Sequence, residues 1–371
     1  MNATSTTETT YADADEAPLL ELQNVTVAFG EQESWLQELG IFGDMLGEPR
    51  TVRAVDNVSL TLHENDVVAL VGESGCGKTT LGKAAIGIHR PASGTVSYRG
   101  QDIWEARDER GDVDIPFRAI RRSLQIIHQD PGSSLNPNKR VITTLSKPLR
   151  KWERDMPRDQ RETRIYELLE RVGMSPATDY AQRYPHQLSG GEKQRVALIR
   201  ALLMNPDVIL ADEAISALDV SLRIEMMDLL LELQDVFNTS YLFISHDLSN
   251  ARYIAERAGG RIGVMYLGKI VEIGPVEEIL NNPQHPYTQV LRWATPHLEE
   301  GEQTDIPIRK IDIPDPVNPP AGCRFHTRCP EARTVCANQH PQEFAVSNEH
   351  EAACFRVKDD HEYWQSDPLV D

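Results

Sequence analysis

The fold is decided by one stretch of the chain, Gly72-Glu73-Ser74-Gly75-Cys76-Gly77-Lys78-Thr79-Thr80. It fits the pattern G-x-x-x-x-G-K-[ST] at every fixed position. The apolar run Val67–Val71 before it predicts a buried strand, and Lys78–Ile88 predicts a helix that leaves the loop. A strand, a glycine-rich loop and a helix in this order predict an α/β fold built around a phosphate-binding loop.

The residue types in this loop suit the binding of a nucleoside triphosphate. Its glycines let the backbone turn N–H groups toward phosphate oxygens, and the start of the helix adds a favourable dipole. We expect Lys78 to reach the β- and γ-phosphates and the Thr79 hydroxyl to ligate Mg²⁺. Without the flanking strand and helix, the same letters would indicate only a glycine-rich turn.

The charge balance of the chain limits the kinds of partner that it can bind. The 371 residues include 57 acidic and 38 basic side chains, a formal net charge of −19. Nucleic-acid-binding surfaces are normally basic, so this balance argues against DNA or RNA as the main partner. The basic residues are mostly arginine, and an acidic, lysine-poor surface suits a high-salt cytoplasm that screens carboxylate repulsion. We expect a halophilic source, with an ordinary acidic protein as the alternative.

No segment indicates secretion or a membrane span. Residues 1–17 are polar and acidic, which predicts a disordered tail and not a signal peptide. No run approaches the ~20 apolar residues that cross a bilayer. The sequence therefore predicts a cytosolic protein whose association with a membrane depends on a partner.

Strands and helices alternate along the chain. Apolar runs predict further strands at Leu19–Phe29, Ala54–Leu62, Thr95–Tyr98, Leu124–Gln129, Val208–Ala211 and Tyr241–Ser245. This alternation predicts a largely parallel sheet with helices on both faces, and a ligand site at the carboxyl ends of its strands.

Helical patterns fill most of the remaining sequence. Residues 140–184 are expected to be mainly helical, with an amphipathic helix at Arg161–Val172 that Gly173 terminates. A further helix should run from Gln187 to about Met204, and Ser221 should cap a helix through Phe237. Segment 30–53 reads as an insertion with a short helix or a contact surface near the nucleotide, where Phe29 is a weak candidate for stacking on adenine.

Polar residues follow several predicted strands, and alone they would carry little meaning. Asp212 and Glu213 after an apolar strand most often mark a strand end that meets solvent. A single histidine such as His246 is usually structural. Their value comes from their place downstream of the phosphate-binding loop.

Taken in chain order, these motifs resemble those of the ATPase subunit of an ABC transporter. The matches are Walker A at Gly72–Thr79, the Q-loop at Gln129, the signature motif at Leu188–Glu192, Walker B at Val208–Asp212, the catalytic glutamate at Glu213, the D-loop at Ser216–Asp219 and the switch histidine at His246. The resemblance implies a P-loop ABC ATPase fold. It comprises a RecA-like parallel sheet core, an antiparallel β subdomain, a helical subdomain at about 135–204, and a small C-terminal extension.

The resemblance also implies a role for each residue. Glu213 would polarise the attacking water and His246 would contact the γ-phosphate, both as catalytic residues. Thr79 and Gln129 would ligate Mg²⁺, and Asp212 would hold the water shell of the metal. The residues expected to bind ATP are Gly72, Ser74, Gly75, Cys76, Gly77, Lys78, Thr79, Thr80, Gln129 and Asp212. Those expected to face the ATP of a partner subunit are Ser189, Gly190, Gly191, Glu192 and Asp219.

One chain carries one P-loop and one signature motif, so the resemblance implies a dimer. The second subunit is expected to be a related ATPase, with a homodimer as the alternative. Two transmembrane permease subunits and an extracytoplasmic solute-binding protein would complete the transporter. The chain would then lie on the cytoplasmic face of the cell membrane.

A narrower resemblance is to the ATPases of dipeptide/oligopeptide importers. It rests on Gln129–Pro131, Ser134–Pro137, Ser216–Ser221, Val264–Lys269, His285–Thr288 and Pro319–His326. Ala214 and His128 depart from it, where the family usually has Pro and Phe. The implied substrates are peptides; alternatives are a sugar or metal importer, or a non-transport ABC ATPase that acts on nucleic acid. The expected domains are a tail at 1–17, an ATPase domain at 18–280 and an extension at 281–371.

Four of the five cysteines lie in that extension. Cys323, Cys329, Cys336 and Cys354 have the spacing C-x5-C-x6-C-x17-C, which lacks the C-x2-C pairs of common zinc modules. In a reducing cytosol such a cluster favours a metal site over disulfides. Some members of the resembled family carry a 4Fe–4S cluster here. We expect an iron–sulfur cluster, then zinc, then unligated thiols.

Overall fold

The computed structural model describes residues 17–30, 51–295, 308–309 and 312–369. The expected disordered tail, apart from residue 17, and the expected helix within 30–53 fall outside the described residues.

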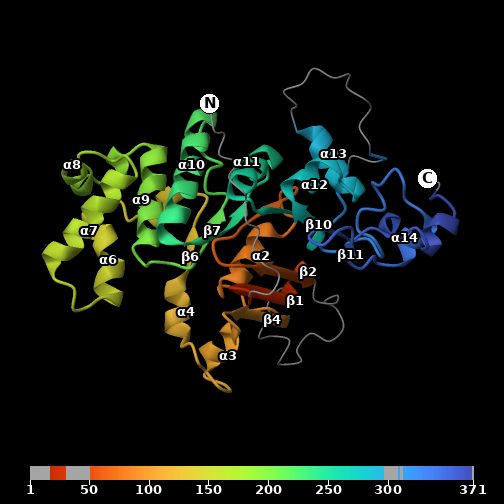
Figure 1. Ribbon diagram of the computed structural model, residues 1–371, viewed down its shortest axis with the longest axis horizontal. Coiled ribbons are helices and arrows are strands. Elements are labelled where there is room, and N and C mark those ends of the chain that lie inside the picture. Colours follow the sequence, from red (N-terminus) through yellow and green to blue (C-terminus); the bar gives the residue numbers. More distant parts are fainter. Residues whose placement is uncertain (1–16, 31–50, 296–307, 310–311, 370–371) are drawn as a thin grey trace, which may run out of the picture.

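An eight-stranded sheet forms the centre of the molecule, in the order β11-β12-β10-β9-β3-β8-β7-β6 (Figure 1). Five strands run parallel: β6 (Leu124–Ile127), β7 (Val208–Asp212), β8 (Ser240–Ile244), β3 (Val67–Val71) and β9 (Arg261–Tyr266). Every residue of β3, β7 and β8 is buried, as in parallel strands covered on both faces. The predicted largely parallel sheet is confirmed for these five strands.

The other three strands extend this sheet in antiparallel fashion. They are β10 (Lys269–Pro275), β12 (Glu351–Ala352) and β11 (Phe344–Ala345). Two-residue strands leave no alternating pattern in a sequence, which is why β11 and β12 were not predicted. Through them the C-terminal region continues the central sheet.

Alternate residues of the parallel strands feed two separate cores. Val68 and Leu70 of β3 join the core that contains helix α2 (Lys78–Ala85) and a second sheet. Val67 and Ala69 join the core that contains helix α11 (Leu248–Ala258) and the helices between residues 141 and 202. The twofold period of a strand thus places helices on both faces of the sheet.

The second sheet is antiparallel, with the order β2-β1-β4-β5. Its strands are β1 (Leu20–Gly30), β2 (Thr51–Leu62), β4 (Ser93–Tyr98) and β5 (Gln101–Asp102). The strand predicted at Thr95–Tyr98 is confirmed as part of β4, which forms a hairpin with β5. Two short helices that the sequence did not predict follow it, α3 (Ile103–Asp108) and α4 (Phe117–Ser123).

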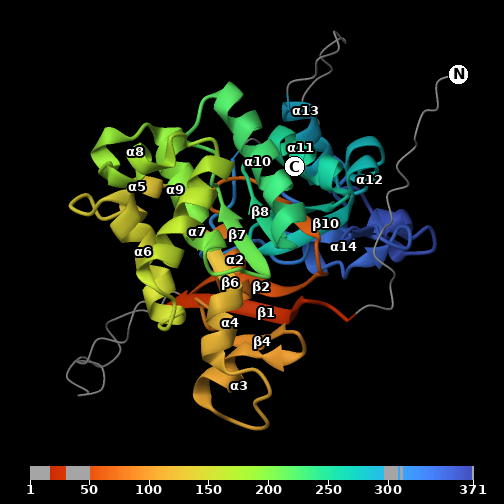
Figure 2. The ribbon, with the colours of Figure 1, turned by 60° about the vertical axis from the view of Figure 1, so that its left-hand side comes forward.

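A helical region occupies one end of the molecule, and the C-terminal region occupies the other (Figures 1 and 2). The first comprises α5 (Pro131–Ser134), α6 (Val141–Trp152), α7 (Arg158–Arg171), α8 (Ala177–Gln182) and α9 (Gly190–Leu202). The second includes α12 (Val276–Asn281), α13 (Pro286–Ala294) and α14 (Thr334–Asn338). Gly173 has a φ of +76°, which confirms its predicted role in ending α7.

One predicted helix cap was wrong. Helix α10 (Val220–Phe237) ends where predicted, but its N-cap is Asp219, whose carboxylate accepts a hydrogen bond from the Leu222 N–H at 3.0 Å. An N-cap residue has extended backbone outside the helix, and Ser221 already lies within the first turn. In the part of the chain that the structure describes, no helix is long and apolar enough to cross a bilayer.

Candidate nucleotide-binding site

The loop between β3 and α2 packs closely against the backbone of neighbouring strands. Two of its positions have room only for glycine. A Cβ atom on Gly72 would lie 2.0 Å from the Met265 carbonyl oxygen of β9, and one on Gly77 would lie 2.1 Å from that of Ala54. Their φ angles, +150° and +108°, also disfavour other residues. Close packing and backbone conformation together account for both positions.

Lys78 extends back into the loop that precedes it. Its Nζ donates hydrogen bonds to the carbonyl oxygens of Gly72 at 2.7 Å and Glu73 at 3.0 Å. The residue is 4% exposed, so the ammonium group lies inside the loop. Phosphate oxygens of a bound nucleotide could replace the two carbonyl oxygens as its hydrogen-bond acceptors. Burial raises the pKa of the neighbouring Cys76 thiol, so Cys76 fills space here as a protonated side chain.

Five polar residues meet beside the loop, at the carboxyl ends of the strands. The Thr79 hydroxyl donates to Asp212 at 2.7 Å, on the last residue of β7. The Gln129 amide donates to the Glu213 carboxylate at 3.0 Å, and His246 Nδ1 lies 3.4 Å from the same oxygen. Thr79, Gln129, the adjacent pair Asp212 and Glu213, and His246 come from four separate segments, and the parallel sheet brings them together.

Glu213 has an unusual backbone. Its φ is +48°, and its N–H donates to the Ile244 carbonyl oxygen of β8 at 3.1 Å. A left-handed conformation costs a non-glycine residue about 1 kcal/mol. Such strain is found where the position of a side chain matters for function.

A cleft of about 530 Å³ opens beside these residues. It is lined by Thr79, Lys83, His128, Gln129, Asp130, Arg200 and Asp212. Sequence reasoning missed Lys83 and Arg200, although Lys83 follows Thr79 by four residues and so shares its face of α2. Burial, and then the charge of Lys83, lowers the pKa of His128, which therefore lines the cleft as a neutral imidazole.

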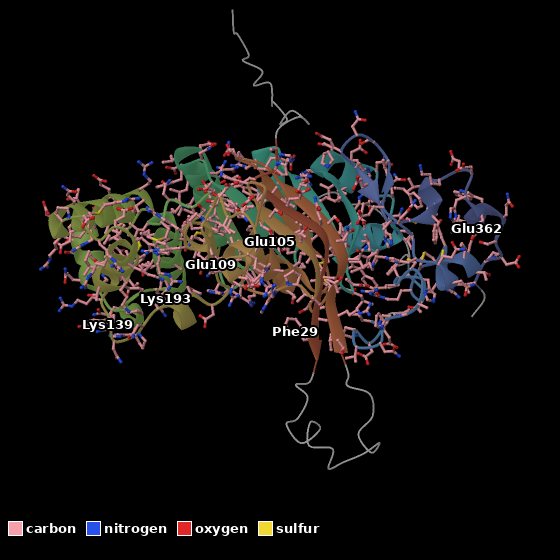
Figure 3. The ribbon with its side chains drawn as sticks, turned by 90° about the horizontal axis from the view of Figure 1, so that it is seen from below. Phe29, Glu105, Glu109, Lys139, Lys193 and Glu362 are labelled. Carbon is pink, nitrogen blue, oxygen red and sulfur yellow. The ribbon has the colours of Figure 1, made fainter. Side chains whose placement is uncertain are left out.

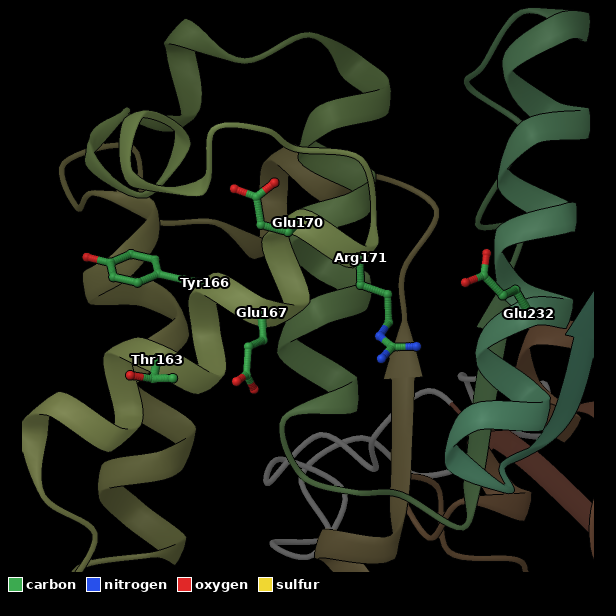
Figure 4. Close-up of a pocket in the computed structure, with 6 residues that line it drawn as sticks. All are labelled: Thr163, Tyr166, Glu167, Glu170, Arg171 and Glu232. Carbon is green, nitrogen blue, oxygen red and sulfur yellow. The ribbon is translucent and has the colours of Figure 1, made fainter.

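A larger hollow, of about 680 Å³, lies between α7 and α10 and is a poor nucleotide site. Figure 4 shows Arg171 extending from α7 toward α10, with carboxylates on both helices. The lining residues are Thr163, Tyr166, Glu167, Glu170, Arg171 and Glu232. Three carboxylates against one cation would repel a triphosphate.

The residues expected to serve a partner subunit sit at the starts of two helices. Ser189 caps α9, accepting from the Glu192 N–H at 3.2 Å, while the Glu192 carboxylate accepts from the Ser189 N–H at 2.6 Å. Asp219 caps α10. A Cβ atom on Gly190 would meet nothing within 4 Å, so the start of α9 is open to an approaching group.

Phe29, the weak candidate for adenine stacking, lies at the end of β1 (Figure 3). It is 44% exposed and touches the His89 ring edge-on, with centroids 5.5 Å apart. The Phe29 side chain is thus partly exposed, and its stacking role stays a prediction.

The four C-terminal cysteines line one small pocket, with a volume of about 20 Å³. All are free thiols. Burial raises the pKa of Cys329 and Cys354 to about 12, and that of Cys323 still further. Within the described residues, no group of three or more His, Cys, Asp or Glu side chains is arranged to hold a metal ion. The predicted metal site is therefore not supported by the geometry.

Comparison with known proteins shows which family this chain belongs to. Residues 55–216 match the ABC transporter family, and residues 271–336 match the oligopeptide/dipeptide transporter C-terminal region. The oligopeptide transport ATP-binding protein AppF of Bacillus subtilis is 40% identical over 343 residues, which cover 92% of this chain and 98% of AppF. The chain belongs to the ABC transporter ATP-binding proteins. The resemblance inferred from the motifs is confirmed.

Other relatives agree with this assignment. The dipeptide transport ATP-binding protein DppF of Escherichia coli is 40% identical over 316 residues, covering 85% of this ABC protein and 90% of DppF. The dimeric, post-hydrolysis structure of the ATP-binding cassette MJ0796 with ADP and Pi is 27% identical, with a TM-score of 0.55 over 69% of this chain and 98% of that chain. This ABC protein is thus an ATPase with the predicted cassette fold.

Proposed function

We propose that this ABC ATPase hydrolyses ATP to drive the uptake of di- or oligopeptides. The observation that carries the substrate class is the match of residues 271–336 to the oligopeptide/dipeptide transporter C-terminal region. The printed names of AppF and DppF, which align over most of this chain, support the same class. A sugar or metal importer is the alternative. The acidic balance of the chain disfavours a non-transport ABC ATPase that acts on nucleic acid.

The contacts beside the P-loop support a division of roles. Lys78 and the loop N–H groups would bind the β- and γ-phosphates. Thr79 and Gln129 would ligate Mg²⁺, and Asp212 would hold its water shell; the bound ion would supply positive charge against the charge that develops on the phosphates. Glu213 would orient the attacking water, and His246, which lies against the same carboxylate, would contact the γ-phosphate.

A second subunit would complete the site. Ser189, Gly190, Gly191 and Glu192 open a helix whose N-terminus favours a phosphate, and Asp219 caps the next long helix. The dimeric form of the cassette MJ0796 supports this arrangement. The partner is a related ATPase, with a homodimer as the alternative. The pair acts on two permeases at the cytoplasmic face of the membrane, and an extracytoplasmic solute-binding protein delivers the solute to them. The ATPase domain spans 18–280, with a helical subdomain at about 135–204 and an extension at 281–371.

The extension, we propose, holds a 4Fe–4S cluster. A single zinc ion needs four thiolates that converge at about 2.3 Å on one point, an arrangement that the described residues do not offer. A cluster takes one thiolate on each of four iron atoms, and the proposal is supported by the four cysteines that line one pocket. Because burial keeps these thiols protonated, loading would release protons.

Anaerobic purification tests the cluster. A brown protein with broad visible absorbance and about four irons per chain supports it, and Cys329→Ser should lose the colour while Cys76→Ala keeps it. A colourless protein with one zinc, or with no metal, overturns it.

The peptide role is tested in the assembled transporter. The chain is reconstituted with its permeases, partner ATPase and binding protein, and ATP turnover is measured with defined peptides, sugars and metal ions. Stimulation by peptides that also bind the binding protein supports the proposal. Stimulation only by a sugar or a metal ion overturns the substrate class.

A further inference from the structure

The C-terminal region contacts the P-loop from outside the nucleotide cleft. Arg328, which lies between Cys323 and Cys329 in sequence, donates from Nη1 to one oxygen of Glu73 at 2.9 Å and from Nη2 to the other at 3.0 Å. Arg328 is 4% exposed, and Glu73 is the second residue of the loop. Such a two-pronged pair fixes direction as well as charge, and lysine cannot reproduce it.

A second contact holds the backbone of the same residue. The Glu73 N–H donates to the Tyr287 hydroxyl at 2.8 Å. Tyr287 is fully buried in α13, and its ring packs against Tyr266 and Phe325 with centroids 4.6 and 5.4 Å away. The side chain and backbone of Glu73 are therefore both held by residues beyond 281.

Arg328 is fixed in turn by the same aromatic cluster. Its Nη1 also donates to the Tyr266 hydroxyl at 3.3 Å, and its guanidinium lies 5.6 Å from the Phe325 ring centroid. Tyr266 ends β9, the strand against which Gly72 packs. The pair is thus built into rigid structure on both sides and is not a chance surface contact.

The charge of Glu73 makes this pair matter for ATP. Its carbonyl oxygen accepts from Lys78 Nζ at 3.0 Å, so the residue belongs to the wall of the phosphate-binding loop. Its side chain is 24% exposed. An unpaired carboxylate at this place would repel the negative charges of a triphosphate.

We propose that Arg328 is a positioning residue for the nucleotide site. By pairing with Glu73 it fixes the first half of the P-loop and cancels a negative charge within it, so the C-terminal region sets the affinity for ATP without touching the nucleotide. This inference rests on the proposed phosphate-binding role of the loop.

Binding of ATP to the full-length chain tests the inference. Titration calorimetry is run on the wild type, Arg328→Gln, Glu73→Gln with Arg328→Gln, and Lys78→Ala. Arg333→Gln is the matched control, because Arg333 holds the carbonyl oxygens of Trp364 and Ser366 within the C-terminal region. Steady-state KM and kcat of the assembled transporter are measured for each variant.

Arg328→Gln should raise Kd and KM for ATP about tenfold, with kcat within about twofold of the wild type. The double variant, which removes the carboxylate as well, should return Kd to within about twofold of the wild type. The Arg328→Gln defect should shrink in ~1 M KCl because salt screens the repulsion. Arg333→Gln should bind ATP as the wild type does.

Three outcomes overturn the inference: unchanged affinity in Arg328→Gln, no recovery in the double variant, or an equal defect in Arg333→Gln. If Arg328→Gln does not fold, Arg328→Lys replaces it; about threefold weaker binding supports the inference, and wild-type affinity overturns it. Lys78→Ala distinguishes a failure of the Arg328 inference from a failure of the proposed phosphate-binding role of the loop. Undiminished ATP binding by Lys78→Ala would contradict the role of the loop itself.

Discussion

At the scale of single residues, the site depends on short contacts that the parallel sheet brings together. Thr79 bonds to Asp212, and Gln129 and His246 meet at the Glu213 carboxylate. Lys78 lies inside the loop with two backbone carbonyls as acceptors. Replacing a residue that makes one of these contacts should therefore have a defined effect on ATP binding or hydrolysis.

Lys78→Ala should weaken ATP binding about 10- to 100-fold, because a charge-assisted hydrogen bond contributes about 1.5–3 kcal/mol. Calorimetric titration with ATP measures this. Lys139→Ala is the control, since it removes the same charge from an exposed site in the helical region (Figure 3). Equal binding by Lys78→Ala and the wild type would remove Lys78 from the site.

Motif spacing predicted the residues that now meet in this site, because each follows a strand of one parallel sheet. It did not predict the pairing of Arg328 with Glu73, which joins residues 255 positions apart. Nothing in local spacing reports such a contact, since it depends on how the C-terminal region packs on β9. Lys83 was within reach of sequence reasoning and Arg200 was not.

At the scale of secondary structure, fully buried strands could be predicted from the sequence, whereas short helices and helix starts could not. β3, β7 and β8 are buried throughout and largely apolar, and they were found almost to the residue. α3 and α4 have six and seven residues, too short for a clear helical period. The start of α10 was misplaced because serine and aspartate both suit an N-cap and only the backbone distinguishes them.

The cap of α13 carries a pH dependence. His285 Nδ1 accepts from the Tyr287 N–H at 3.1 Å, and burial lowers the pKa of His285 to about 4. The unfolded chain, with a histidine pKa near ~6.5, then binds more protons between pH 6.5 and 4. The stability that neutral His285 contributes is present above pH ~6.5 and is lost as the pH falls toward ~4, by up to about 3 kcal/mol.

Urea unfolding of the wild type and His285→Asn across this pH range checks the effect. Asparagine keeps an acceptor for the Tyr287 N–H but does not titrate. The variant should therefore lose less stability on acidification. Parallel pH profiles for the two proteins would rule out His285 as the titrating group.

At the scale of the whole molecule, the charge of −19 predicts a response to salt. We propose a halophilic source, which the acidic, lysine-poor composition supports. The melting temperature should rise between ~0.1 and ~2 M KCl, as the screening length falls from ~10 Å to below ~3 Å. Thermal melts in KCl measure it, with equal osmolarities of sucrose as the control. A melting temperature indifferent to KCl would contradict the proposal.

The whole molecule also joins an ATPase core to a C-terminal region at one end of the same sheet (Figure 1). The core could be predicted because its motifs follow strands of one parallel sheet and meet at the carboxyl ends of those strands. The way the extension joins it could not, because β11 and β12 are two residues long and the cysteines indicate chemistry without indicating position.

The most direct test of the central claim is ATP turnover by the assembled transporter with Glu213→Gln in this subunit. The variant should bind ATP like the wild type and hydrolyse it at least about 100-fold more slowly at this site, because the amide cannot polarise the attacking water. Calorimetry and single-turnover phosphate release measure the two quantities. Undiminished hydrolysis at this site would contradict the account.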